Sequence, residues 1–165
     1  MTYYTKNLKV TTKDGIKQIK ELKVGDEILT LGPEYYKVVN IDKNIYKDTY
    51  ILSIFHKGLF EKIRLAADTR VAVAKKDKDG EYILDKFMAV EELKQKYADR
   101  MDRIEAINER EAEDEGLLKV ILYDIASDEG YAVWLTYVGD PLFTITYGIE
   151  TENGYAIAVN GLLTK

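Results

Sequence analysis

Cysteine is absent from the 165-residue sequence, histidine occurs once and proline occurs twice. Without cysteine, no disulfide frame, thiolate zinc site or cysteine nucleophile is possible, and the redox compartment stays open. The sequence also lacks an apolar run long enough for a signal peptide or a membrane span. We therefore expect a chain that is not secreted through a classical signal and that has no membrane partner.

The sequence has little excess charge of either sign, since 24 Lys or Arg stand against 29 Asp or Glu, a formal net charge of -5. Nucleic-acid binding draws on clustered Lys and Arg that face phosphates, so a nucleic-acid partner is not expected. Thirteen Tyr with two Pro and eleven Gly instead favour a compact β-rich domain. A nucleic-acid-binding β-barrel stays open as an alternative, on the tyrosines alone.

Runs rich in β-branched and aromatic residues predict strands along most of the chain, with polar turns between them. Apolar residues at Ile16, Ile19 and Leu22 predict a short helical turn that ends at Gly25. Glycine-containing turns are predicted at 13–15, 139–141 and 153–154. The predicted strands cover residues 8–12, 27–31, 35–41, 49–55, 60–65, 70–74, 82–84, 117–125, 131–137, 143–149 and 155–159.

The period of the apolar residues changes at Ala89. From there to Gly116 they recur at three and four positions with charged residues between them, which predicts one helix of roughly 25 residues, about 38 Å long. Residues 89–116 hold ten Asp or Glu and five Lys or Arg, so this segment carries the whole net charge. We therefore predict a long acidic helix, 89–116, inserted between two β halves, residues 1–88 and 117–165.

The order of these elements resembles the Hint domain of inteins and hedgehog autoprocessing proteins. The segment Val10–Ile28, a hairpin followed by Val-Gly-Asp, is similar to the first intein block. Phe60–Val73 resembles the second block, in which "I-x-x-T-x-x-H" is followed by an alternating strand. Gly139–Lys165, with its Asn-Gly-Leu-Leu at 160–163, resembles the terminal blocks. The resemblance implies a mainly β, Hint-like pseudo-two-fold domain with one long inserted α-helix.

The same resemblance implies that the catalytic positions in the first half are substituted. The family's nucleophile, a Cys or Ser, would fall near Tyr3 or Tyr4, and a phenol does not readily perform an acyl shift. The Thr and His that polarise the scissile amide in the family correspond to Ala66 and Thr69. Neither an activated nucleophile nor the family's His base is therefore expected here.

The resemblance implies that the catalytic positions in the second half of the sequence are substituted as well. The family's assisting Asp would fall at Thr144, or at Gly148 if the loop register shifts. The final His-Asn pair, which cyclises in the family, corresponds to Thr164-Lys165, and we expect no segment downstream of it. Taken together, these substitutions favour natural loss of splicing over engineering, which usually changes one or two residues. We therefore predict no catalytic residue.

The other residues that could in principle take part in catalysis or metal binding have structural explanations. The single histidine, His56, lies in a turn beside Gly58 with no cysteine in the chain, which is typical of a surface residue. Ser53 and Ser127 lack a G-x-S-x-G nucleophile elbow. The acidic run at 109–115 lacks the alternating ligands and the glycine of a calcium loop. The sequence therefore predicts no cofactor and no metal.

The predicted helix is the remaining candidate for a functional surface. Its apolar seam is close to a heptad pattern over fewer than three repeats, which is short for an autonomous coiled coil. The seam therefore either packs on its own β domain or docks on a neighbouring subunit, where its acidic face would meet a basic surface. The candidate partner-binding residues are Val90, Leu93, Tyr97, Met101 and Ile104.

These observations predict a non-enzymatic structural or assembly protein built on a catalytically inactive Hint-like domain. Its partners would be other proteins or further copies of itself in a larger assembly, for example a phage particle, and it would be cytoplasmic or virion-associated. A self-processing intein, engineered or variant, that performs protein splicing or cleavage is the alternative from another class. The masses of the chain and of its fusions after incubation would separate the two hypotheses.

Overall fold

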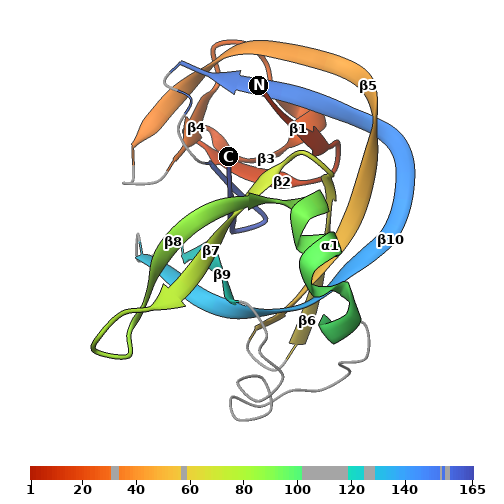
Figure 1. Cartoon of the computed structure of the whole chain (residues 1–165). Coiled ribbons are helices and arrows are strands. Elements are labelled where there is room, and N and C mark those ends of the chain that lie inside the picture. The colour runs from red at the N-terminus through yellow and green to blue at the C-terminus, as the bar shows by residue number, and fades with distance from the viewer. Residues whose placement is uncertain (31–33, 57–58, 102–118, 125–128, 153, 155–156) are drawn as a thin grey trace.

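The computed structural model describes the chain except for residues 31–33, 57–58, 102–118, 125–128, 153 and 155–156 (Figure 1). Within the described residues the chain forms twelve strands, one α-helix and one 3₁₀ helix, so the predicted mainly β fold is confirmed. The strands are β1 (Thr2–Thr5), β2 (Lys9–Thr12), β3 (Gly15–Gln18), β4 (Glu27–Leu29), β5 (Tyr35–His56), β6 (Leu59–Ala66), β7 (Arg70–Lys76), β8 (Tyr82–Ala89), β9 (Lys119–Asp124), β10 (Glu129–Thr151), β11 (Ile157–Val159) and β12 (Leu162–Thr164).

Two long antiparallel strands, β5 and β10, form the frame of the molecule and run beside each other around its edge in Figure 1. The sequence predicted each as two shorter strands with a turn between, and that prediction is wrong. Asn44 and Asp140 take left-handed backbone conformations (φ 58° and 51°), and the pairing register shifts close to each. The polar residues that suggest turns therefore form bulges, which bend a strand without ending it.

The first hairpin joins β2 to β3 through a turn at Gly15, whose φ of 109° is one that other residues rarely adopt. The predicted helical turn over 16–22 is only partly right, because residues 16–18 belong to β3 and a 3₁₀ helix (η1) spans Ile19–Glu21. Ile16 pairs with Thr11 and is 71% exposed, whereas Ile19 is fully buried. Strand pairing thus overrides the three-residue spacing of the apolar side chains.

The helix α1 (Val90–Met101) follows β8 directly, so the predicted change from strand to helix lies where the sequence placed it. Residues 102–116 of the predicted helix lie outside the described residues. Val90 and Leu93 are fully buried among the core side chains of this chain, which agrees with packing of the seam on its own β domain at these two positions, while docking of the seam on a partner stays a prediction. The side chains of Tyr97, Met101 and Ile104 lie outside the described part.

The strands of the two predicted halves are interleaved. β10 pairs with β1 and β5, and β7 pairs with β8, β9 and β12. The path through the sheet is β11-β12-β7-β9-β10-β1-β6-β5-β4-β2-β3, with β8 paired to β7. One main cluster of buried apolar residues contains side chains from both halves, among them Ile63 and Leu162. The division into residues 1–88, 89–116 and 117–165 stays a prediction.

Candidate functional site

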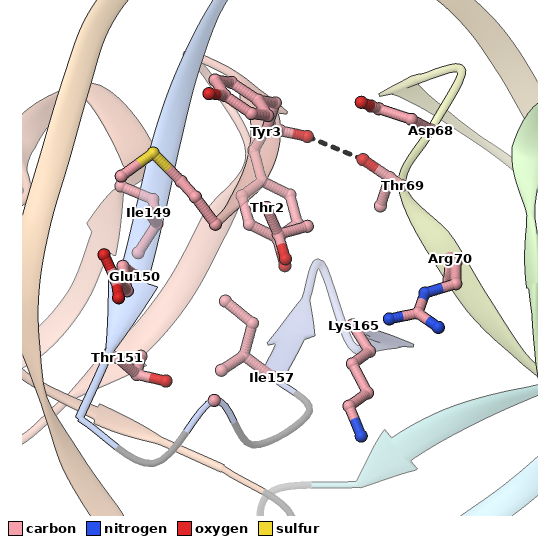
Figure 2. Close-up of a pocket in the computed structure, with 13 residues that line it drawn as sticks. Thr2, Tyr3, Asp68, Thr69, Arg70, Ile149, Glu150, Thr151, Ile157 and Lys165 are labelled. Carbon is pink, nitrogen blue, oxygen red and sulfur yellow. Dashed lines mark hydrogen bonds between the residues drawn. The ribbon is translucent and has the colours of Figure 1, made fainter.

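A polar pocket of about 230 Å³ lies where the beginning and the end of the sequence meet (Figure 2). Its walls come from β1, from the loop between β6 and β7, from the end of β10 and from the last residue. Tyr3, Thr69 and Lys165 all line it, although they are far apart in the sequence. The pocket therefore gathers three of the segments that the sequence resemblance singled out.

Strand β1 reaches the pocket because it is held between two other strands. It pairs antiparallel with β10, which places Tyr3 opposite Gly148, and it also contacts β6, with Tyr4 opposite Leu65. A Cβ at Gly148 would lie 2.5 Å from the sulfur of Met1 and 2.8 Å from Cε1 of Tyr3. The missing side chain thus leaves room for the side chains of Met1 and Tyr3 over Gly148, and a larger residue at 148 would displace these side chains.

The loop between β6 and β7 is fixed by four backbone hydrogen bonds. The Ala67 N–H donates to the carbonyl of Asp48 at 2.8 Å, and the Thr69 N–H donates to Ala66 at 3.1 Å. At the start of α1, the N–H groups of Val90 and Glu91 donate to the carbonyls of Thr69 and Ala67, each at 2.9 Å. Free N–H groups at a helix start are strong donors, so the helix holds this loop in place.

Thr69 is buried, and its hydroxyl donates a hydrogen bond of 2.8 Å to the backbone carbonyl of Tyr3 (Figure 2). The sequence resemblance placed Thr69 at the position of a group that polarises a peptide bond. A hydroxyl that donates to a carbonyl oxygen withdraws electron density from it and fixes the peptide in one orientation. Thr69 therefore contacts the backbone of the segment where the resemblance placed the nucleophile.

The end of the sequence completes the pocket. Arg70 and Lys165 exchange two backbone hydrogen bonds, of 2.8 Å and 3.2 Å between N and O. The hydroxyl groups of Tyr4 and Thr164 lie 2.8 Å apart, and Thr164 Oγ1 donates to the carbonyl of Ile157 at 3.0 Å. The first and last strands are thus joined by side chains as well as by the sheet.

Tyr4 is the most perturbed titratable group among the described residues. Its side chain is buried, and burial raises the pKa of its phenol well above the ordinary value, although hydrogen bonds with Thr164 and Thr2 oppose this shift. The phenol therefore stays neutral and serves as a hydrogen-bonding group. The contact between the Tyr4 and Thr164 hydroxyls thus links the first strand to the last strand.

The structure brings some of the sequence-predicted site residues together and separates others. Ala66 is fully buried at the end of β6, directly before the loop, and Thr164 contacts Tyr4. Thr144 lies farther along β10, opposite Lys47 of β5, whereas Gly148 lies opposite Tyr3. The chemical role, or lack of one, that the resemblance implied for each position stays a prediction.

Several residues in the pocket or beside it were missed by sequence reasoning. Thr2 and Arg70 line the pocket, and Asp68 adds a carboxylate beside Thr69. Lys47 forms an ion pair with Asp68 at 2.6 Å, and its Nζ lies 3.8 Å from the centroid of the Tyr3 ring. The signal for Thr2 was present, since it is a β-hydroxyl residue beside the expected nucleophile. Nothing local could have indicated Lys47, because its partners are distant in the sequence.

The described residues contain no group of three or more His, Asp or Glu side chains that could hold a metal ion. Of the helices in the described part of the chain, none has the length and apolar character needed to span a membrane. The side chains that line the pocket offer hydroxyls, the carboxylates of Asp68 and Glu150, the guanidinium of Arg70 and the ammonium of Lys165.

The comparisons with known proteins identify the fold. No protein-family model and no curated protein matches the sequence. Among solved structures, the gp41-1 intein matches with a TM-score of 0.60 at 17% identity, over 99% of this chain and 98% of that chain. A DnaB intein from Synechocystis sp. PCC 6803 matches with a TM-score of 0.65 at 13% identity, over 99% and 97%. The Msm DnaB1 intein splicing domain, solved with bound zinc, matches with a TM-score of 0.58 at 13% identity, over 98% of each chain.

These matches confirm the predicted Hint-like fold, which the chain shares with inteins over almost its whole length. They also correct the functional prediction. We expected a non-enzymatic structural or assembly protein, but the matching structures are inteins, one of them described as a splicing domain, and they favour the self-processing alternative. The substitution of family residues was therefore not sufficient ground to predict an inactive protein.

Proposed function

We propose that this chain is a self-processing domain that rearranges a peptide bond at the start of its own first strand and thereby cleaves or splices polypeptide attached to its ends. The observation that carries the proposal is the shared pocket. There the start of β1 and Lys165 lie together, and Thr69 donates to the carbonyl of Tyr3 at 2.8 Å. The intein-like fold supports the same reading.

The first step needs a nucleophile beside a scissile bond. A hydroxyl on a β-carbon attacks the carbonyl of the preceding residue through a five-membered ring, which the longer side chain of tyrosine cannot form. Thr2 carries such a hydroxyl and lines the pocket. Its target is the carbonyl carbon of Met1.

The atoms of this step balance without a further reagent. A bond forms between Thr2 Oγ1 and the carbonyl carbon of Met1, and the Met1–Thr2 C–N bond breaks. The hydroxyl proton passes to the released amino nitrogen of Thr2, and an ester replaces the amide. Water or a second nucleophile then attacks the ester, which is easier to cleave than the original peptide bond.

Thr69 and the last residue have separate tasks in this scheme. The hydrogen bond from Thr69 to Tyr3 holds the backbone next to Thr2, and so restricts the orientation of the reacting residue. The backbone pairing of Arg70 with Lys165 places the end of the sequence at the same pocket. A segment attached after Lys165 would therefore start near the ester, as joining of the two flanking segments requires.

The test is a fusion in which the chain lies between two well-folded reporter domains of different mass. We expect incubation of the purified fusion to release fragments cut next to Thr2, or a ligated product of the two reporters, identified by intact mass. Thr2→Val should abolish the reaction and Thr2→Ser should preserve it, since serine keeps the β-hydroxyl. Hydroxylamine should accelerate cleavage by capturing the ester.

The proposal is overturned if the wild-type fusion keeps its full mass with and without hydroxylamine while its circular dichroism shows the folded β domain. Cleavage that is equally fast in Thr2→Val would leave self-processing standing and would remove Thr2 as the nucleophile. Contaminating protease is excluded by a rate that does not depend on protein concentration and by a fusion of the same reporters without the chain.

A further inference from the structure

Lys47 contacts both segments that form the centre of the pocket. Its Nζ lies 2.6 Å from Asp68 Oδ2, in the loop that carries Thr69, and 3.8 Å from the centroid of the Tyr3 ring in β1. The lysine side chain is 25% exposed, so it is partly shielded from solvent. One ammonium group therefore bridges the loop and the first strand.

The backbone around Lys47 adds to this bridge. Lys47 belongs to β5, which is held along its length by β10, and the carbonyl of its neighbour Asp48 accepts the N–H of Ala67 at 2.8 Å. Strand β5 thus holds the loop through a backbone hydrogen bond, and the Lys47 side chain adds contacts with Asp68 and Tyr3. Both contacts lie beside the hydrogen bond from Thr69 to Tyr3.

We propose that Lys47 is a positioning residue, which holds the loop carrying Thr69 against the first strand and favours an aromatic side chain at position 3. This inference rests on the proposed function, since the strand that Lys47 holds is the one whose bond rearranges. A cation above an aromatic face is attracted by the ring electrons, and an aliphatic side chain offers no such surface. The ion pair with Asp68 holds the ammonium group of Lys47 over the Tyr3 ring.

Five variants separate the two contacts of Lys47. Lys47→Met keeps an unbranched side chain only one atom shorter and removes the charge, whereas Lys47→Arg keeps a cation. Asp68→Asn removes the ion pair and keeps both the lysine and the ring. Tyr3→Phe keeps the ring and Tyr3→Leu removes it. A matched control is Lys75→Met, which removes an ion pair with Asp85, at 3.5 Å, on the neighbouring hairpin β7–β8.

Two readouts are measured on each variant. The first is the processing rate of the reporter fusion, which we expect Lys47→Met and Tyr3→Leu to lower about tenfold, because misplacement of a reacting group slows reaction. Lys47→Arg and Tyr3→Phe should stay within about twofold of wild type. The second is hydrogen exchange of the Ala67 and Thr69 amides, which should be faster in Lys47→Met and unchanged in Lys75→Met.

The two readouts test the proposed function and the role of Lys47 separately. If the wild-type fusion is not processed, the proposed function fails, and hydrogen exchange still decides whether Lys47 holds the loop. Unchanged exchange at Ala67 and Thr69 in Lys47→Met overturns the positioning role. An equal loss of rate in Lys47→Met and Lys47→Arg, or in Tyr3→Leu and Tyr3→Phe, overturns the part of the inference that concerns the cation and the ring.

Discussion

The hydroxyl of Tyr4 gives a prediction for a single residue. Tyr4→Phe removes the contact with Thr164 and should lower the free energy of unfolding by about 1 kcal/mol at pH 7. Burial raises the pKa of this phenol above its ordinary 10.0, so at high pH the unfolded chain loses the Tyr4 proton before the folded chain does. The wild type should therefore lose about 1.4 kcal/mol per pH unit relative to Tyr4→Phe above about pH 10.

Urea denaturation of both proteins between pH 7 and pH 11 measures this difference. The comparison of two variants cancels the titration of the other tyrosines and the lysines, which both proteins share. We expect Tyr4→Phe to be the less stable protein at pH 7 and to approach or exceed the wild type near pH 11. A stability difference that stays constant over this range would show that Tyr4 ionises equally in the folded and unfolded chains.

The sequence located part of the site and missed the rest for an identifiable reason. The positions of Tyr3 and Thr69 followed from short motifs, because neighbouring turns and strands fix where those motifs lie. Lys47 belongs to a polar stretch that was taken for a turn, and its partners Asp68 and Tyr3 are 21 and 44 residues away by their numbers. Contacts of that kind depend on strand pairing, which no local pattern specifies.

The helix α1 gives a prediction for an element. Its first N–H groups hold the loop at Ala67 and Thr69, and Leu93 anchors it in the core with no exposed surface. Leu93→Ala should lower the free energy of unfolding by about 2–5 kcal/mol, through lost burial and the cavity that remains. Denaturant unfolding measures this loss, and hydrogen exchange should report faster opening at Thr69.

The control for the helix is Lys96→Ala on its solvent side, where the lysine pairs with Glu92 at 3.6 Å. An exposed pair at this spacing contributes a few tenths of a kcal/mol, so the variant should unfold almost as the wild type does. If Leu93→Ala were as stable as Lys96→Ala, the helix would not be anchored through its buried seam.

Strand lengths were the least accurate part of the sequence prediction. Polar residues near Asn44 and at 139–141 indicate turns when they are considered locally. In the folded chain β5 and β10 pair along their lengths, and these polar residues form bulges within the strands. Each bulge is stabilised by the strand that pairs with it, and the sequence of one strand does not indicate which strand that is.

At the scale of the whole molecule, the fold was predictable from the sequence, whereas the prediction of a non-enzymatic protein had to be corrected. The hairpin at the start, the segment Phe60–Val73 in the middle and the Asn160-Gly161 turn at the end each mark a place in the Hint fold. Function was inferred from the family's catalytic residue types, which Tyr3 and Ala66 do not match. That reasoning placed the nucleophile near Tyr3 or Tyr4, whereas Thr2, which also lines the pocket, carries a β-hydroxyl.

The meeting of the two chain ends can be tested by circular permutation. The hydrogen bonds between Arg70 and Lys165 and between Thr69 and Tyr3 place both ends at one pocket. We expect a permutant in which a linker of about eight residues, with a reach of about 25 Å, joins Lys165 to Met1 to fold when it is opened in the 77–81 turn. Its denaturation midpoint should lie close to that of the wild type.

A permutant with the same linker, opened inside β10 between Thr144 and Ile145, should not fold, because the cut interrupts the pairing with β5. Failure of the first permutant, with the linker lengthened as a check for strain, would contradict the shared position of the ends.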